Sequence, residues 1–347
     1  MKSILPHIVI FIFSFFLNLI LIKFILKIAH KFKWYDDIDS RKIHEGEIPR
    51  IGGIGIASSF FIPAISISLI FSINISIFWS LLLGAAIINF VGILDDFKNL
   101  RPLYKFIGQI AAALIVIFSG NYFTSFYIPF FGITVNSIFV GQTVTLIWII
   151  GITNAVNLID GMDGFSSSIT AIISMAMGLA AFFSGNYTQS LMLFILSGSI
   201  SGFLIFNFPP AKLFMGDSGS LFIGFVLASM PLYALKGEIS SYSLILGISF
   251  LLIPLYDTLG AIIRRKIRGV PFHSPDMDHL HHKLLALGLS KKLIILFTDI
   301  VTLIVSGTAV MFVIYKSNLY LYIQLAEWAV VLLLFILVSI KRKNHTV

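Results

Sequence analysis

Apolar runs of helix length alternate with short polar stretches along almost the whole chain. A helix needs about 20 consecutive apolar residues to cross a lipid bilayer. On this criterion we predict eleven transmembrane helices, at residues 4–26, 52–72, 76–94, 103–120, 138–158, 166–184, 190–208, 218–235, 242–263, 292–315 and 319–340. The predicted fold is an all-α, polytopic integral membrane protein that forms one domain over residues 1–347.

Two segments need a separate interpretation. Residues 121–137 contain Pro129, Gly132 and several aromatic side chains, and we predict a short hairpin at the membrane–water boundary, where aromatic rings are common. Residues 1–24 begin with a single Lys and continue as a long apolar run without an Ala-x-Ala-like site. We expect them to form a retained first span rather than a cleaved signal peptide.

The composition supports the membrane assignment and limits the chemistry. The chain is 58% hydrophobic and 12% charged, whereas a soluble domain is usually about 25% charged. There is no cysteine, which excludes disulfides and thiolate chemistry and leaves carboxylates, histidines and bases for any site. The net charge of +8 is interpreted as a signal of membrane orientation rather than of nucleic-acid binding.

The positions of the charges predict the orientation. With eleven spans, 21 of the 24 Lys and Arg residues fall on one side, and the other side holds only Lys2, Lys236 and Lys316. Cytoplasmic loops carry this excess, so we expect the N-terminus outside and the C-terminus in the cytoplasm. Twelve of the 16 acidic residues, and every histidine except His7, lie on the same cytoplasmic side. The candidate active site is therefore on the cytoplasmic loops.

Two pairs of aspartates follow apolar helices on that side. Asp160 and Asp163 are each followed by glycine, which is typical of a tight turn, and a solvated loop is the alternative for them. Asp95 and Asp96 end the third predicted span. Adjacent carboxylates are suited to hold Mg²⁺ beside phosphates, although surface pairing with Lys98 and Arg101 is an equal alternative.

Two further segments contain polar residues next to glycines. Arg50 precedes Gly52 and Gly53, and a guanidinium beside exposed backbone N–H groups can approach an anion, whereas loop topology alone explains Arg41 and Lys42. Asn207 is followed by two prolines that end the seventh span, and Asp217-Ser218-Gly-Ser begins the eighth. We expect an Asp or Ser there to cap the free N–H groups of the helix.

The last polar segment is basic and rich in histidine. Four bases precede a proline-bounded loop with four histidines: Arg264, Arg265, Lys266, Arg268, His273, His279, His281 and His282. Clustered histidines can bind zinc, but the flanking bases favour an anion such as a diphosphate, and no His-Glu-x-x-His motif is present. Acids, bases and glycine turns on one membrane face indicate Mg²⁺-assisted phosphoryl transfer, with a lipid as one substrate.

At these residues the chain resembles the polyprenyl-phosphate N-acetylhexosamine-1-phosphate transferases. The shared motifs are Pro49-Arg-Ile-Gly-Gly53, Asp95-Asp96, Asn154-Ala-Val-Asn-Leu-Ile-Asp-Gly-Met-Asp-Gly164, Phe214-Met-Gly-Asp-Ser-Gly-Ser220 and Pro271-Phe-His-Ser-Pro-Asp-Met-Asp-His-Leu-His-His282. The resemblance covers essentially the whole chain. It implies a Mg²⁺-dependent bacterial inner-membrane enzyme, with Mn²⁺ as a substitute metal, that transfers an N-acetylhexosamine 1-phosphate, expected to be GlcNAc 1-phosphate, from a UDP-sugar to undecaprenyl phosphate and releases UMP.

The resemblance also assigns residues. It implies metal binding by Asp217, Asp95 and Asp160, and catalytic roles for Asp95, Asp96, Asp160, His279, His281 and His282. It implies substrate binding by Arg50, Lys105, Asn157, Asp163, Asn207 and Arg265. The expected partners are a UDP-N-acetylhexosamine, undecaprenyl phosphate and the lipid bilayer, with no nucleic acid; a homodimer is left open.

Two alternatives are kept. The His-Leu-His-His run resembles the WecA/TagO type, but Met277 and Lys283 depart from its usual basic residue and Arg, so another UDP-N-acetylhexosamine or UDP-MurNAc-pentapeptide remains a candidate donor. A membrane transporter is the alternative of another class. It would use the acids that fall within predicted spans, namely Asp257, Asp299 and Glu327.

Overall fold

A computed structural model describes residues 3–35, 48–70, 78–129, 131–235, 237–270 and 278–345. Several residues of the sequence motifs lie outside this described part, among them Arg41, Lys42, His273, Asp276 and Met277.

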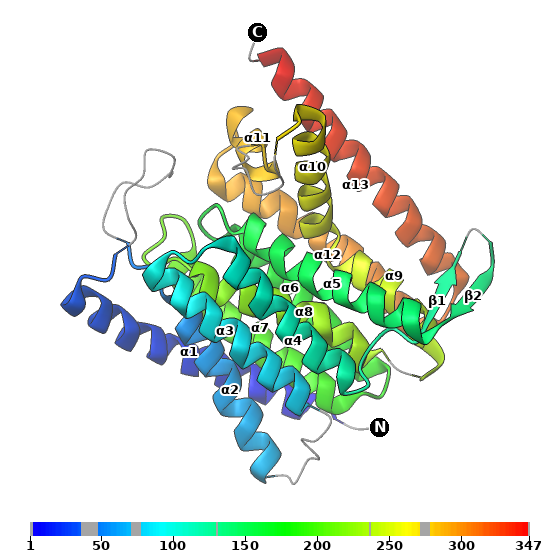
Figure 1. Cartoon of the computed structure of the whole chain (residues 1–347), viewed down its shortest axis with the longest axis horizontal. Coiled ribbons are helices and arrows are strands. Elements are labelled where there is room, and N and C mark those ends of the chain that lie inside the picture. Colours follow the sequence, from blue (N-terminus) through cyan, green and yellow to red (C-terminus); the bar gives the residue numbers. More distant parts are fainter. Residues whose placement is uncertain are drawn as a thin grey trace.

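The described chain is a bundle of helices (Figure 1). They are α1 (Leu5–Phe32), α2 (Gly52–Ile70), α3 (Trp79–Lys98), α4 (Pro102–Phe118), α5 (Ile138–Ile159), α6 (Phe165–Phe183), α7 (Tyr187–Asn207), α8 (Gly216–Ala234), α9 (Ser243–Phe250), α10 (Leu252–Arg268), α11 (Leu280–Ala286), α12 (Lys291–Tyr315) and α13 (Asn318–His345), with a 3₁₀ turn at Gly237–Tyr242. The prediction of an all-α polytopic protein is confirmed. The hairpin predicted within 121–137 is confirmed too: β1 (Ser125–Ile128) pairs antiparallel with β2 (Ile133–Asn136).

Eight described helices are long and apolar enough to cross a membrane, namely α1, α3, α5, α6, α7, α8, α12 and α13. The bent pair α9–α10 gives a ninth if it is counted as one span, and α2 and α4 are apolar but shorter. Each of the eleven predicted runs therefore coincides with one helix or with this bent pair. The chain is a multi-pass membrane protein.

The prediction of one continuous helix at 242–263 is wrong. The chain bends by 73° where α9 meets α10. Pro254 has no N–H to donate to the carbonyl four residues earlier, and its ring crowds that carbonyl, so a helix cannot run straight through this point. After the bend α10 continues to Arg268, which places Arg264 and Arg265 on a helix rather than in a loop. α10 and α11 lie together beside the upper part of α13 (Figure 1).

Helix α8 forms the centre of the bundle. Its entire apolar window is buried, whereas only 17% of that of α1 and 11% of that of α13 are buried. α3 and α5 pack along α8. Two glycines bring neighbouring helices close to its first turn. A Cβ on Gly53 would lie 2.0 Å from the backbone nitrogen of Gly219, and one on Gly92 would lie 2.5 Å from the Cα of Ser218.

Candidate functional site

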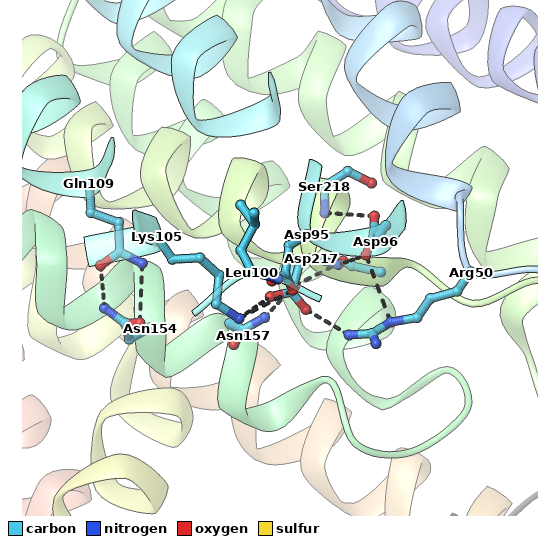
Figure 2. Close-up of polar contacts among 12 residues, drawn as sticks. Arg50, Asp95, Asp96, Leu100, Lys105, Gln109, Asn154, Asn157, Asp217 and Ser218 are labelled. Atoms are coloured by element: carbon cyan, nitrogen blue, oxygen red, sulfur yellow. Dashed lines mark hydrogen bonds and ion pairs between the residues drawn. The ribbon is translucent and has the colours of Figure 1, made fainter. Parts of the chain in front are cut away.

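Five charged residues from four segments meet at the start of α8 (Figure 2). We call them the acid–base cluster: Arg50, Asp95, Asp96, Lys105 and Asp217. Arg50 precedes α2, the two aspartates end α3, Lys105 lies in the first turn of α4, and Asp217 lies in the first turn of α8. Helices that are far apart in the sequence thus bring their polar ends to one place.

Lys105 and Arg50 hold Asp217 between them. The Lys105 Nζ lies 2.9 Å from Asp217 Oδ2 and 3.2 Å from Asp95 Oδ2, so one ammonium group bridges two carboxylates. On the other side, an Arg50 guanidinium nitrogen donates to Asp217 Oδ1 at 2.7 Å. Asp217 is only 4% exposed, and a carboxylate that is this buried requires such partners.

Asp96 caps α8 from a different helix. Its two carboxylate oxygens accept hydrogen bonds from the backbone N–H groups of Asp217, at 2.7 Å, and Ser218, at 3.0 Å. The expectation that Asp217 or Ser218 would cap this helix is therefore wrong, because the capping side chain comes from α3. The alternative of surface pairing also fails: Asp95 binds Lys105 and the Leu100 N–H at 2.8 Å, and the side chain of Asp96 is 1% exposed.

The backbone around Arg50 fixes its position. The N–H groups of Gly52 and Gly53 donate to the carbonyls of Phe214 and Met215 at 3.0 and 2.8 Å, and the N–H of Phe214 donates to Pro49 at 2.9 Å. These three backbone hydrogen bonds join the segment before α2 to the segment before α8. Gly216, which follows them, has a φ of 72°, and a Cβ there would lie 2.6 Å from the carbonyl oxygen of Arg50. Glycine therefore suits this position on both counts.

The two aspartates of the turn between α5 and α6 have different surroundings. Asp160 faces the acid–base cluster; burial raises its pKa well above the usual value, the charge of Arg50 opposes that rise, and Asp217 and Asp96 add to it. Asp163 instead accepts from the Lys291 ammonium at 2.9 Å and from the Ala211 N–H at 3.4 Å. The turn therefore places one carboxylate beside the cluster and anchors itself to α12 with the other.

The two asparagines predicted to bind substrate both have partners within the protein. Asn157 donates to the hydroxyl of Ser220 at 2.8 Å. Asn207 is 3% exposed; its carbonyl oxygen accepts from the Gly164 N–H and the Ser167 hydroxyl, and its amide donates to the carbonyl of Leu213. Asn207 thus holds the end of α7 to the turn that carries Asp160.

The last residues of the histidine motif, Leu280 to His282, begin α11, which docks on the same turn. His281 is 1% exposed, and a Cβ on Gly161 would lie 2.8 Å from its Nε2. Burial, followed by the neighbouring His282, lowers the pKa of His281 to about 3, so its ring is neutral near pH 7. The ring of His281 lies parallel to the ring of His279, and their centroids are 6.1 Å apart. The centroid of the His282 ring lies 4.3 Å from that of His281. Arg265, on α10, is 8% exposed.

The three acids within predicted spans do not form a common site in the described part of the chain. Asp257 binds His279, and Glu327 accepts from the Thr308 hydroxyl at 2.6 Å. Asp299 lines a cavity of about 550 Å³ between α6, α7 and α12. The arrangement that a transporter would need, with these acids gathered at mid-membrane, is absent from the described residues.

The donor set at the cluster suits a divalent cation that keeps part of its own water. In the described part of the chain no group of three His, Asp, Glu or Cys side chains is arranged to enclose a metal. Mg²⁺ does not require such a cage, because it is usually held by one or two carboxylates plus water and substrate phosphates. Asp95 and Asp217 fit this description, and the ammonium of Lys105 already bridges them as a cation would.

Sequence reasoning missed two residues that help to build the site. Lys291 pairs with Asp163 across 128 positions, and Asp257 pairs with His279. From the sequence, Lys291 is only one of the 21 basic residues on the cytoplasmic side, and Asp257 is only one of the acids within predicted spans. Partner identity depends on which helices pack together, so no local pattern could have found either pair.

Comparison with known proteins gives the family. Residues 78–235 match the model of glycosyl transferase family 4. The chain is 33% identical, over 87% of its length and 84% of the relative, to the Bacillus subtilis protein named "Probable undecaprenyl-phosphate N-acetylglucosaminyl 1-phosphate transferase". It is 34% identical to the decaprenyl-phosphate N-acetylglucosaminephosphotransferase of Mycobacterium leprae, over 74% of the chain and 71% of the relative.

A third relative, the phospho-N-acetylmuramoyl-pentapeptide-transferase of Staphylococcus carnosus, is 29% identical over 78% of the chain and 88% of the relative. The described residues of the motifs that indicate a family lie at the acid–base cluster, on the turn of Asp160 and at the start of α11. The chain therefore belongs to glycosyl transferase family 4 and, within it, to the WecA/TagO-like group.

Proposed function

We propose that this protein transfers GlcNAc 1-phosphate from UDP-GlcNAc to undecaprenyl phosphate in the bacterial inner membrane, and releases UMP. The relatives of Bacillus subtilis and Mycobacterium leprae are named for this type of reaction on polyprenyl phosphates. The single observation that carries the proposal is the acid–base cluster, in which Asp217 and Asp95 share the ammonium of Lys105 at the end of an apolar bundle. Phosphoryl transfer depends mainly on positioning and on stabilising charge, and such a cluster supplies both.

We also propose the membrane arrangement. The eleven predicted runs cross the membrane, with α9 and α10 as one bent crossing, the N-terminus outside and the C-terminus in the cytoplasm. The excess of Lys and Arg on one side of this arrangement supports it. The cluster then lies on the cytoplasmic face, where UDP-sugars are made and where the phosphate of a membrane-embedded lipid can reach it.

We propose Mg²⁺ as the cofactor, held by Asp217 and Asp95 with Asp160 nearby, and Mn²⁺ as its substitute. When bound, the metal would neutralise the charge on the diphosphate of the nucleotide sugar. Lys105 and Arg50 bind phosphate oxygens and orient them. Asp96 holds the N-terminus of α8, whose dipole favours an anion. His281 of α11 closes the site on the side of the Asp160 turn.

The test is direct assay of the purified protein. Undecaprenyl phosphate, Mg²⁺ and UDP-GlcNAc should yield UMP and a lipid-linked sugar in equal amounts. Asp217→Asn should lower turnover by at least about a hundredfold, because it removes charge from the cation site. The control is Asp299→Asn, which alters a carboxyl that lines the cavity between α6, α7 and α12 and should retain activity. Near-normal turnover in Asp217→Asn would remove that residue from the proposed metal site.

The Staphylococcus carnosus relative supports a second candidate donor within the same chemistry. The assay therefore includes UDP-MurNAc-pentapeptide and a second UDP-N-acetylhexosamine. Turnover with one of these and none with UDP-GlcNAc would keep the reaction and change the sugar. No turnover with any donor, from protein with a cooperative unfolding transition, would reject the proposed function.

A further inference from the structure

Asp257 and His279 form a buried pair next to the histidine helix. Asp257 lies in α10 and His279 immediately precedes α11, and their side chains are 2% and 7% exposed. The His279 Nδ1 lies 2.7 Å from Asp257 Oδ2. The other oxygen, Oδ1, accepts the backbone N–H of Leu280 at 2.8 Å. One carboxylate thus binds both the imidazole ring and the first turn of the helix that carries the motif.

This geometry sets the position of the proton on the ring. A carboxylate can only accept hydrogen bonds, so the ring nitrogen that faces it must donate. The second bond, from the Leu280 N–H, also uses Asp257 as an acceptor, through its other oxygen. A neutral His279 therefore carries its proton on Nδ1 and has an unprotonated Nε2. Residues that bind a functional histidine through its other nitrogen commonly fix its tautomer in this way.

We propose that Asp257 is the positioning residue of His279, and that it makes Nε2 of that ring a hydrogen-bond acceptor toward the substrate. This inference rests on the proposed function in one respect only, which is that His279 contacts substrate. An acceptor at Nε2 repels a phosphate oxygen and suits an O–H or N–H group. His279 would therefore bind a sugar hydroxyl, an amide N–H or the nucleobase, and the diphosphate would be left to Lys105 and Arg50.

The neighbouring histidine is consistent with this assignment. His281, whose ring lies parallel to that of His279, is neutral near pH 7 because burial lowers its pKa to about 3. The ring of His281 therefore offers no positive charge to a diphosphate near pH 7. Its neutrality agrees with a role of the neighbouring His279 in recognising uncharged polar groups rather than in neutralising phosphate.

The substitution Asp257→Asn should change the tautomer of His279 without changing the shape of the site. In this variant the amide oxygen can still accept the Leu280 N–H, and the amide NH₂ group then faces His279 Nδ1 as a donor. That contact requires an unprotonated Nδ1 and moves the proton to Nε2. The reverse orientation of the amide is disfavoured, because it would place the NH₂ group against the Leu280 N–H. The variant is therefore nearly isosteric with the native side chain and reverses the predicted tautomer.

The first measurement is nitrogen NMR of the full-length protein, labelled with ¹⁵N-histidine and held at about pH 8, above the ordinary imidazole pKa. The signals of His279 are identified by their loss in His279→Gln. The native protein should show a protonated Nδ1 and an unprotonated Nε2, and Asp257→Asn should show the reverse. Asp299→Asn, the same change at a carboxyl outside this pair, should leave the native pattern unchanged. A native His279 protonated on Nε2, alone or together with Nδ1, overturns the proposal.

The second measurement is turnover in a double-mutant cycle. Asp257→Asn should lower kcat by about 10- to 100-fold, as is typical when the partner of a functional histidine is lost. In a His279→Gln background the same change should cause no further loss. An equal loss in both backgrounds would mean that Asp257 acts through the docking of α11 and not through His279. If the native protein turns over no donor, the proposed function fails, while the NMR result still decides the role of Asp257.

Discussion

At the scale of single residues, chemical identity does not reveal role. Five aspartates of the candidate site look equivalent in the sequence, yet each has a different environment. Asp217 is held between two cations, Asp95 shares one of them, Asp96 caps a helix, and Asp163 anchors a turn to α12. Asp160 lies beside these groups, where burial raises its pKa.

The neutral His281 gives the protein a predictable sensitivity to acid. Its folded pKa of about 3 lies below the ordinary value of 6.5, so between these values the unfolded chain binds a proton that the folded chain excludes. The contribution of His281 to stability is present above about pH 6.5 and is lost as the pH falls. The free energy of unfolding should fall by about 1.4 kcal/mol for each pH unit below that value, which amounts to about 2 kcal/mol at about pH 5.

The measurement is the unfolding temperature in detergent between about pH 7 and pH 5. Carboxylates titrate in the same range, so the comparison is with His281→Gln, which should show a shallower fall than the native protein. His30→Gln changes an exposed histidine and should follow the native curve. Parallel curves for the native protein and His281→Gln would show that the buried ring is not kept neutral.

At the scale of elements, the first turn of α8 is held by close contact with α2 and α3. A Cβ on Gly92 would lie 2.5 to 2.6 Å from backbone atoms of Ser218 and Asp217, and backbone cannot move aside as a flexible side chain can. We expect Gly92→Ala to destabilise the protein by about 1 to 3 kcal/mol, as overpacking does, and to lower turnover because Asp217 shifts.

Gly151→Ala is the matched control for that substitution. Gly151 also lies within a helix, α5, but a Cβ there would meet nothing within 4 Å. Since Ala favours a helix over Gly by about 1 kcal/mol, this control should be neutral or slightly stabilising. Unfolding temperature and turnover are measured for both variants, and equal effects would argue against close packing at α8.

The existence of the elements could be predicted from the sequence more fully than their geometry. Every predicted apolar run corresponds to one helix or, at 242–263, to the bent pair α9–α10, because length and apolar character are local properties. The bend between α9 and α10 had a visible signal in Pro254, but the apolar run continued through it. The cap of α8 had no local signal, since Asp96 lies 121 positions before the N–H group of Asp217 that it binds. The resemblance of the motifs predicted which side chains belong to the candidate site, and packing decided which of them meet.

At the scale of the whole molecule, the predicted orientation can be tested with unusual clarity because the chain has no cysteine. Each introduced cysteine is therefore the only one present. With eleven crossings, Thr134→Cys in β2 and Asn318→Cys at the start of α13 should react with an impermeant maleimide in intact cells. Lys98→Cys at the end of α3 should react only after the membrane is opened. All three positions are exposed. Labelling of Lys98→Cys from outside would show that the orientation is the reverse of the predicted one. If only one of Thr134→Cys and Asn318→Cys were labelled from outside, the predicted number of crossings would be wrong.

The complete burial of α8 has a consequence for how the protein is made. This helix has a mean hydropathy of 1.2, the lowest of the eight candidate spans, whereas the lipid-facing α1 and α13 have 2.7 and 2.4. A segment of modest hydropathy partitions weakly into bare lipid. The helices that enclose it most fully, α3 and α5, come earlier in the chain and can already be in the membrane when α8 leaves the ribosome. Insertion of the helix that carries Asp217 would then depend on its neighbours as a template, so a substitution on α3 could reduce the yield of inserted protein before any catalytic defect became measurable.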